Sequence, residues 1–313
     1  MEINRILIAS PIYEKFEKLL EDKVIFTEKE FRFRAMDQVE DEDYLWADCY
    51  VGFTRPPNFQ FGNIKWIHSL GAGVDKLLKD VEWKESVLLT RTIGPFGKKM
   101  SEYCLSYLLA EFQNHSLYKE QQGKKEWKFS IPSNLNGKKV AVYGTGAIGQ
   151  ELARYLAFFG VEVYGVSLSG VDKPYFSKVI SSEDESNFPL KEMDAVINTM
   201  PLTEKTHHFF AEKRFQEFQQ VIFINVGRGE SVNDEALLGA IERGNIKRAI
   251  LDVFHEEPLQ EEHPFWTHPQ IQITPHISAV TDPESGLDCF LDTLKKVEIG
   301  NGLINAVDMK RGF

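Results

Sequence analysis

Three polar segments contain the side chains best suited to chemistry, and each closely follows an apolar run typical of a β-strand. The segments are NVGRG at 225–229, LDVFHEEP at 251–258 and TPHIS at 274–278. Ligands of open α/β sheets bind beyond the carboxyl ends of the strands, so loops at these positions are expected to converge. They supply Arg228, a planar cation that binds carboxylates, Glu257, which can hold an imidazole, and His276, whose ring titrates near neutral pH. Each of these residues alone would more often be a surface or structural residue than a catalytic one. The prediction therefore depends on their order along the chain and on their positions after predicted strands.

A glycine-spaced turn between an apolar strand and a helix predicts a dinucleotide site. The segment VAVYGTGAIG at 140–149 holds Gly144, Gly146 and Gly149 in the pattern GxGxxG. Residues 138–143 are typical of a strand, and the apolar residues after the turn have helical spacing. Gly160 ends this helix, and a second apolar run follows at 161–166. In such a unit, backbone amides at the helix N-terminus can approach a pyrophosphate closely.

The composition is that of a globular protein with two domains of ordinary size. The chain has 313 residues, of which 42% are hydrophobic and 27% charged, and its net charge is −11. An acidic chain is a poor nucleic-acid binder, because phosphate contacts need a basic face. The three cysteines lie far apart, the histidines lack metal-ligand spacing, and no apolar run reaches the length of a membrane span. We therefore expect a cytoplasmic protein with no metal, nucleic-acid partner or membrane anchor.

Apolar, β-branched runs alternate with helical stretches along the chain, which predicts an α/β fold with parallel sheets covered on both faces. The predicted strands are 3–9, 49–52, 65–68, 87–91, 139–143, 161–166, 194–199, 221–226, 249–253 and 271–274. A connecting helix is expected at 101–117, where leucines recur at helical spacing. Residues 170–190, rich in Ser, Asp, Glu and Pro, are expected to form a loop around short elements.

In their order, these motifs resemble the D-isomer-specific 2-hydroxyacid dehydrogenases. The resemblance begins with SLGAGVD at 69–75 and includes the glycine turn, MPLTEKT at 200–206, GRG at 227–229, LDVFHEEP and PHIS. MSEY at 100–103, PHISAVT at 275–281 and the ending AVDMKRGF are similar to the glyoxylate/hydroxypyruvate reductase A branch. The resemblance implies two Rossmann-like or flavodoxin-like doubly wound domains. The nucleotide-binding domain, 97–281, is then inserted into a substrate domain formed by 1–96 and 282–313.

The resemblance also assigns roles to the polar residues. Reduction of a 2-oxo acid needs a hydride on the carbonyl carbon, a proton on its oxygen and a cation for the carboxylate. His276 corresponds to the proton donor, Glu257 to the acid that holds its imidazole, and Arg228 to the cation that binds the carboxylate and polarises the carbonyl. The residues that correspond to a substrate-carboxylate loop are Gly71, Ala72 and Gly73. The residues that correspond to dinucleotide contacts are Gly144, Thr145, Gly146, Ala147, Ile148, Gly149, Met200, Pro201, Thr206, Val226, Asp252 and His276, with Asp252 at the nicotinamide carboxamide.

The end of the second predicted Rossmann strand favours NADP(H) over NAD(H). An NAD enzyme usually places an acid there to bind the ribose hydroxyls, whereas this chain continues with Ser167, Leu168 and Ser169. Without that carboxylate there is no repulsion of a 2′-phosphate, and the two serine hydroxyls and Lys173 can donate hydrogen bonds to it. The arginine of a strong NADP site is also missing, and Asp172 lies nearby, so NAD(H) stays possible.

Two alternatives to an NADPH-dependent reductase of glyoxylate or hydroxypyruvate remain open at this point. One is an NAD-dependent relative that acts on another D-2-hydroxy acid, such as lactate, phosphoglycerate or a branched-chain acid. The other is a dinucleotide-sensing binding protein without turnover, because proteins of that kind can keep the same trio. The resemblance further implies a homodimer formed largely through the nucleotide-binding domains.

Overall fold

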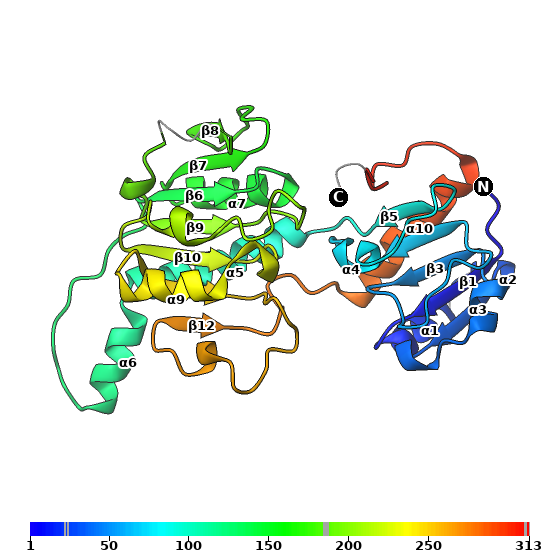
Figure 1. Ribbon diagram of the computed structural model, residues 1–313, viewed down its shortest axis with the longest axis horizontal. Coiled ribbons are helices and arrows are strands. Elements are labelled where there is room, and N and C mark those ends of the chain that lie inside the picture. The colour runs from blue at the N-terminus through cyan, green and yellow to red at the C-terminus, as the bar shows by residue number, and fades with distance from the viewer. Residues whose placement is uncertain (22, 24, 184–187, 310–311, 313) are drawn as a thin grey trace. The chain divides into compact units, whose positions relative to one another are not determined.

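The chain folds into two compact units, seen in the computed structural model of Figure 1. The structure describes all residues except 22, 24, 184–187, 310–311 and 313. Unit 1 comprises Met1–Gly94 and Thr281–Phe313, and unit 2 comprises Pro95–Val280. Unit 2 is therefore an insertion between two segments of unit 1. The boundaries expected from the sequence, 96/97 and 281/282, lie next to these positions.

Unit 2 is built on a seven-stranded sheet whose neighbouring strands are all parallel, in the order β12-β11-β10-β9-β6-β7-β8. The chain runs outward from β6 through β7 and β8, then crosses back to β9 and runs outward in the opposite direction. This reversal creates a topological switch point between β6 and β9, where doubly wound folds bind their ligands. The strands are β6 Lys139–Tyr143, β7 Glu162–Ser167, β8 Lys178–Ser181, β9 Ala195–Asn198, β10 Val221–Asn225, β11 Ile246–Leu251 and β12 Ile271–Ile273.

Helices cover both faces of this sheet, because alternate residues of each strand point to opposite sides. In β6, Val140 and Val142 pack with the helices α5 and α7, whereas Ala141 and Tyr143 belong to a second apolar cluster that includes α9. Burial on both faces explains the nearly continuous apolar sequence of the central strands. The helices of unit 2 are α5 Phe96–Phe112, α6 His115–Gly123, α7 Ala147–Phe158, α8 Glu212–Phe215 and α9 Asp234–Glu242, with 3₁₀ turns at Leu190–Glu192, Gly229–Ser231 and Pro264–Trp266.

Unit 1 contains a smaller parallel sheet of five strands in the flavodoxin-like order β2-β1-β3-β4-β5. One face packs against α1 and α10, and the other against α3 and α4. The strands are β1 Arg5–Ala9, β2 Glu30–Arg34, β3 Cys49–Gly52, β4 Trp66–Ser69 and β5 Leu88–Arg91. The helices are α1 Tyr13–Glu21, α2 Ile25–Glu28, α3 Asp41–Trp46, α4 Asp75–Leu78 and α10 Pro283–Ile299, with a 3₁₀ turn at Met36–Gln38.

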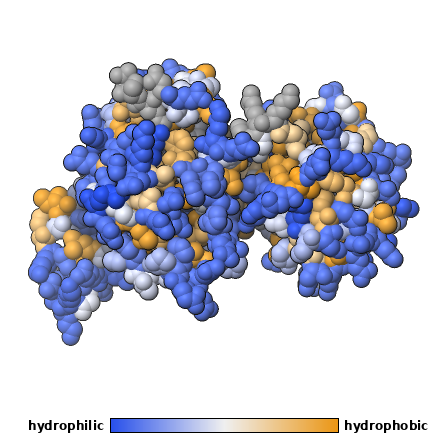
Figure 2. Space-filling model, in the orientation of Figure 1, coloured by the Kyte–Doolittle hydropathy of each residue, from blue (hydrophilic) through white to orange (hydrophobic). Residues whose placement is uncertain are grey.

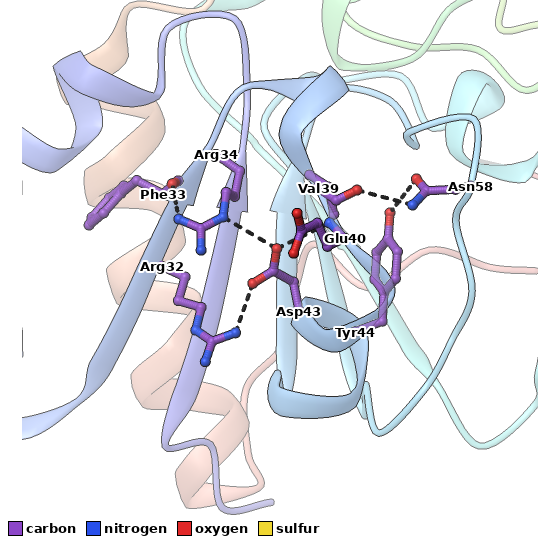
Figure 3. Close-up of polar contacts among 8 residues, drawn as sticks. All are labelled: Arg32, Phe33, Arg34, Val39, Glu40, Asp43, Tyr44 and Asn58. Carbon is purple, nitrogen blue, oxygen red and sulfur yellow. Dashed lines mark hydrogen bonds and ion pairs between the residues drawn. The ribbon is translucent and has the colours of Figure 1, made fainter.

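An ionic network joins α3 to the edge strand β2 (Figure 3). The buried carboxylate of Asp43 lies 2.8 Å from Nη1 of Arg32 and 3.3 Å from Nε of Arg34. It also accepts a hydrogen bond from the backbone amide of Glu40 at 3.2 Å, which forms part of a capping box at the start of α3. The Arg32 guanidinium covers the ring of Trp46, 4.1 Å from its centre. These contacts fix the helix against the outermost strand of the sheet.

Two strands and one helix differ from the prediction. β2 and β8 were not predicted, because both lie at sheet edges and one of them, EFRFR, carries charges where a central strand has apolar residues. The helix expected at 101–117 is wrong in its bounds: α5 starts at Phe96 and ends at Phe112. Asn114, with a left-handed φ of 58°, then separates it from α6. A non-glycine residue in that conformation leaves little signal in a sequence.

Candidate active site

The loops that follow β9, β10 and β11 contact one another at the carboxyl edge of the seven-stranded sheet. A Cβ at Gly227 would lie 2.7 Å from the carbonyl oxygen of Met200, and a Cβ at Gly229 would lie 1.9 Å from the carbonyl carbon of Phe254. Glycine is therefore required at both positions of the GRG segment so that three successive loops can pack closely. Arg228, between these glycines, is held at the centre of the loop cluster.

His276, in the loop after β12, and Glu257, in the loop after β11, form a direct pair. Nδ1 of His276 lies 3.1 and 3.0 Å from Oε1 and Oε2 of Glu257. Since a carboxylate only accepts hydrogen bonds, Nδ1 carries the proton in this contact. Glu257 is itself fixed, because Oε1 also accepts the backbone amide of Phe254 at 3.1 Å. The His276 side chain is 42% exposed, so its Nε2 edge is accessible to a ligand.

Asp252 holds the backbone that carries His276. The backbone amide of His276 donates to the carbonyl oxygen of Asp252 at 2.8 Å, and the histidine has a left-handed φ of 54°. The Asp252 carboxylate accepts the amides of Ile277 and Ser278, each at 2.8 Å, and the hydroxyl of Thr274 at 2.6 Å. Asp252 is fully buried, and its carboxylate binds groups of the protein itself. Its contact with a nicotinamide stays a prediction.

A buried polar network fixes the backbone of Arg228. Its carbonyl oxygen accepts hydrogen bonds from Nδ2 of Asn225 at 3.1 Å and from the hydroxyl of Ser231 at 2.5 Å. Nδ2 of Asn198 donates to both of these side chains, at 2.9 and 2.7 Å. The side chain of Arg228 is partly buried, and its Nη1 donates to the carbonyl oxygen of Gly227 at 2.7 Å.

Asn198 and Ser231 were not predicted as site residues. Asn198 ends β9 and also accepts the amide of Met200 at 3.0 Å, so it shapes the loop 200–206. Its signal in the sequence is an asparagine at the end of an apolar run, a position that Asn225 repeats at the end of β10. A buried amide needs partners, so such asparagines indicate a polar network at the edge of the sheet.

The glycine turn has the shape that a dinucleotide requires. Gly144 has a φ of 96°, and a Cβ there would lie 2.7 Å from Oγ1 of Thr199, which follows β9. A Cβ at Gly149 would lie 1.8 Å from the carbonyl oxygen of Gly144. A Cβ at Gly146 would meet no atom within 4 Å. Two glycines thus serve the packing of strand, turn and helix, and the third leaves open space at the N-terminus of α7 for a pyrophosphate.

The remaining predicted dinucleotide residues surround this turn and the loop after β9. Thr145 is buried, Ala147 exposed and Ile148 partly buried. Met200 and Val226 are buried at the ends of β9 and β10. The Thr206 hydroxyl donates to the carbonyl oxygen of Pro201 at 2.7 Å and accepts the amide of Thr203 at 2.8 Å, which closes the loop on itself.

β7 ends at Ser167, the position where an NAD enzyme usually carries an acid. The Ser167 and Ser169 hydroxyls accept backbone amides of their own loop, at 3.2 and 3.5 Å. In the same loop, the Asp172 carboxylate accepts the amide of Val179 at 3.1 Å and is thus bound to β8. Lys173 is partly exposed in the same loop.

In unit 1, the predicted substrate loop of Gly71, Ala72 and Gly73 follows β4. The hydroxyl of Ser69 lies 3.1 and 3.0 Å from the carbonyl oxygens of Gly71 and Gly73 and accepts the amide of Gly71 at 3.2 Å. Nη1 of Arg91 donates to the carbonyl oxygen of Ala72 at 3.0 Å. The three loop residues are partly exposed, so the loop is both ordered by its neighbours and accessible.

Comparison with known proteins places this arrangement in a family. The sequence profile of the D-isomer specific 2-hydroxyacid dehydrogenase NAD binding domain matches residues 105–278. A glyoxylate/hydroxypyruvate reductase A from Photorhabdus laumondii is 33% identical over 276 residues, which cover 84% of this chain and 87% of that protein. The chain belongs to the D-isomer-specific 2-hydroxyacid dehydrogenase family. It is therefore an oxidoreductase with a nicotinamide dinucleotide site in unit 2.

Solved structures of this dehydrogenase family share the fold over nearly the whole chain. The NADPH-dependent glyoxylate/hydroxypyruvate reductase from Sinorhizobium meliloti, in complex with NADP and sulfate, is 27% identical with a TM-score of 0.89, covering 99% of this chain and 100% of that one. A D-isomer specific 2-hydroxyacid dehydrogenase from Xanthobacter autotrophicus, in complex with NADPH and MES, is 26% identical with a TM-score of 0.89 and full coverage of both chains. The two parallel α/β domains are thus those of the family.

The part of the chain that the structure describes contains neither a metal-binding cluster nor a membrane-spanning helix. Among those residues, no group of three or more His, Cys, Asp or Glu side chains is placed to hold a metal ion. No helix formed by the described residues has the length and apolar character needed to cross a membrane.

Proposed function

We propose that this dehydrogenase reduces a small 2-oxo acid of the glyoxylate or hydroxypyruvate type to the D-2-hydroxy acid, with NADPH as the hydride donor. The observation that carries the proposal is the pair of His276 and Glu257 beside the fixed Arg228 loop. The name of the Photorhabdus relative supports the substrate class, and the bound NADP or NADPH in two structural relatives supports the cofactor.

In this proposal His276 gives a proton to the carbonyl oxygen of the substrate. Nδ1 faces Glu257, which leaves Nε2 as the ring nitrogen that presents the proton. Glu257 also fixes the ring orientation, which general acid catalysis needs because the donor must lie within hydrogen-bond reach of the accepting oxygen. When bound, the dinucleotide supplies the hydride.

Arg228 binds the substrate carboxylate and polarises its carbonyl. A guanidinium forms two parallel hydrogen bonds with a carboxylate, which fixes the plane of the substrate as well as its position. Gly227 and the network of Asn198, Asn225 and Ser231 hold the Arg228 backbone, which fixes the position from which the side chain extends toward a substrate. In unit 1, the accessible loop of Gly71, Ala72 and Gly73 is also proposed, from the family resemblance, to bind a carboxylate.

NADPH is proposed over NADH because of the end of β7. The two serine hydroxyls and Lys173 can approach a 2′-phosphate, and Asp172 is turned toward β8 by its bond to the amide of Val179. An acid at the strand end would instead pair with the ribose hydroxyls and repel the phosphate.

The experiment is an initial-rate assay of NADPH and, separately, NADH oxidation by the purified protein. Glyoxylate, hydroxypyruvate, pyruvate and 2-oxoisocaproate form the panel of 2-oxo acids. Fast NADPH turnover with the first two acids is expected. Preference for a bulky acid would overturn the substrate class and leave the chemistry intact, whereas tight dinucleotide binding with no turnover on any acid would favour a sensor.

We also infer that the protein is a homodimer assembled through unit 2. An apolar, exposed segment beyond α6 supports this proposal: Trp127, Phe129 and Ile131 are 103%, 89% and 77% exposed. Monomeric proteins rarely expose neighbouring large apolar side chains of this kind.

A further inference from the structure

A chain of hydrogen bonds connects α5 to the backbone that carries His276. The Tyr103 hydroxyl of α5 lies 2.6 Å from Oγ1 of Thr274, and Oγ1 of Thr274 lies 2.6 Å from Oδ1 of Asp252. Because the carboxylate only accepts, Thr274 donates its proton to Asp252. The Thr274 oxygen must then accept, so Tyr103 is the donor of the outer bond.

Each bond of this chain acts on the same short segment. Thr274 is two residues before His276, and the Asp252 carboxylate also accepts the amides of Ile277 and Ser278, just after it. The segment is thus anchored on both sides of the histidine. Tyr103 is the outermost anchor and the one that comes from a different layer of the unit, 171 residues earlier in the chain.

We propose that Tyr103 is a positioning residue for His276, acting through Thr274 and Asp252. It contacts neither of the proposed reacting groups. Instead it fixes the rotamer of Thr274, so that the threonine hydroxyl stays directed at Asp252 and the loop keeps the left-handed backbone at His276. The inference rests on the proposed role of His276 as the proton donor. Within the MSEY segment at 100–103, Tyr103 thus has a physical role.

The surroundings of Tyr103 suit a permanent donor. Burial raises the pKa of its phenol more than the Thr274 hydrogen bond lowers it, and the nearby Asp252 and Tyr107 raise it further, so the hydroxyl keeps its proton near neutral pH. Its ring packs against that of Tyr107, one helical turn later, with centres 4.9 Å apart. Removing only the hydroxyl therefore leaves the packing of the ring in place.

Tyr103→Phe tests the proposal, and Tyr107→Phe is the matched control. Both variants remove one phenol oxygen from the same face of α5, but in the described structure only the Tyr103 hydroxyl has a hydrogen-bond partner. For Tyr103→Phe we expect kcat to fall about tenfold with KM and dinucleotide Kd unchanged, since a small displacement of a positioned group costs up to about 100-fold in rate. Tyr107→Phe should keep the wild-type kcat. Equal kcat values for the two variants would overturn the proposal.

Variants of Thr274 show whether the effect runs through the proposed chain. Thr274→Val removes both bonds of the chain, so it should lower kcat at least as much as Tyr103→Phe, and the double variant should be no slower than Thr274→Val alone. Thr274→Ser keeps the hydroxyl and should restore most of the rate. Additive losses in the double variant would contradict the path. His276→Gln in the same assay separates the two proposals. If His276→Gln stays active, the proposed role of His276 as proton donor is wrong. If His276→Gln is inactive but Tyr103→Phe keeps the wild-type rate, only the positioning role of Tyr103 is wrong.

Discussion

Loss of His276 should lower the rate of reduction more than loss of the charge on Glu257. His276→Gln keeps a polar side chain but removes the transferable proton, and general acid catalysis contributes about 10²- to 10⁴-fold, so kcat should fall by about 10³-fold. Glu257→Gln keeps an acceptor for Nδ1 and loses only the charge, so its kcat should fall less, by roughly tenfold. Rates of 2-oxo acid reduction at saturating dinucleotide measure both. A near-normal rate for His276→Gln would refute the assignment, and an unchanged dinucleotide Kd serves as the control for folding.

The cofactor preference is expected to depend on Ser167. Ser167→Asp places a carboxylate at the end of β7, where it repels a 2′-phosphate and accepts hydrogen bonds from ribose hydroxyls. The ratio of kcat/KM for NADPH to that for NADH should therefore fall by about tenfold or more, which corresponds to about 1.4 kcal/mol. Ser167→Asn is the matched variant without the charge and should change the ratio less. An unchanged ratio in Ser167→Asp would show that the phosphate binds elsewhere.

A buried histidine in unit 1 links stability to pH. The ring nitrogens of His68 lie 2.8 and 3.3 Å from the hydroxyls of Thr90 and Thr92, and burial lowers the pKa of this histidine to about 3. The unfolded chain binds this proton near pH 6.5, so the unfolded state holds more protons between the two values. Stability is therefore lost as the pH falls below about 6.5, by at most about 1.4 kcal/mol per pH unit from this group.

Urea unfolding at pH 7, 6 and 5 measures this loss. His68→Gln should show a shallower decrease of unfolding free energy over that range than the wild type. His115→Gln removes an exposed histidine and should follow the wild type. Equal slopes for all three proteins would mean that His68 does not resist protonation.

At the scale of elements, the contact of α3 with the edge strand β2 depends on a single carboxylate. Asp43→Asn leaves Arg32 and Arg34 without their anion and weakens the capping of α3, so we expect a loss of roughly 1–3 kcal/mol in unfolding free energy. Although burial alone would raise the pKa of Asp43, the bonds from Arg32 and Glu40 and the charge of Arg34 hold it below its usual value. This stability is present at neutral pH and is lost as the pH falls below about 4 through the lowered pKa.

Urea unfolding at pH 7 and at pH 3.5 checks both expectations. Glu42→Gln is the control, because Glu42 lies in the same first turn of α3 and is exposed. The difference between the two variants should shrink at the lower pH. A loss for Glu42→Gln equal to that for Asp43→Asn would mean that general charge in the first turn, and not the arginine pair, is responsible.

The sequence predicts elements best where burial on both faces dictates their composition. The central strands β6, β9 and β10 were predicted because each is a run of apolar residues. The edge strands β2 and β8 were missed, since partial exposure permits charged and short sequences. The same limit applies to the site. Motifs led to the proposed roles of Arg228, Glu257 and His276, but the contacts of Asn198 and Tyr103 join residues 27 and 171 positions apart, which no local motif reveals.

At the scale of the whole molecule, the chain leaves unit 1 at Gly94 and returns at Thr281, so unit 1 is completed only after unit 2 has been made. The returning helix α10 packs with α1 and β4 through Phe290 and Leu294. Phe290 lies flat on the ring of Trp66, with centres 5.4 Å apart. The core of unit 1 thus depends on contacts between the two ends of the chain.

The exposed segment beyond α6 provides the last prediction. Figure 1 shows α6 and the residues after it extending from the sheet of unit 2, and Figure 2 shows apolar side chains at this edge. A cavity of about 520 Å³ between α6 and the segment is lined by Tyr118, Trp127 and Phe129, among others. Lys124 and Lys128 of this region are paired with Glu120 and Glu126, so its exposed character is chiefly apolar. A second copy of this chain can cover such apolar side chains.

Replacing the exposed aromatic side chains should therefore dissociate the protein. Light scattering after gel filtration should give a dimer for the wild type and a monomer for the double variant Trp127→Ala, Phe129→Ser, because aromatic anchors typically contribute 2 kcal/mol or more each to an interface. Leu45→Ser, which removes an exposed apolar side chain from α3 of unit 1, should leave the dimer intact. A wild-type monomer at micromolar concentration would refute the dimer, and a dimeric double variant would place the interface on another surface.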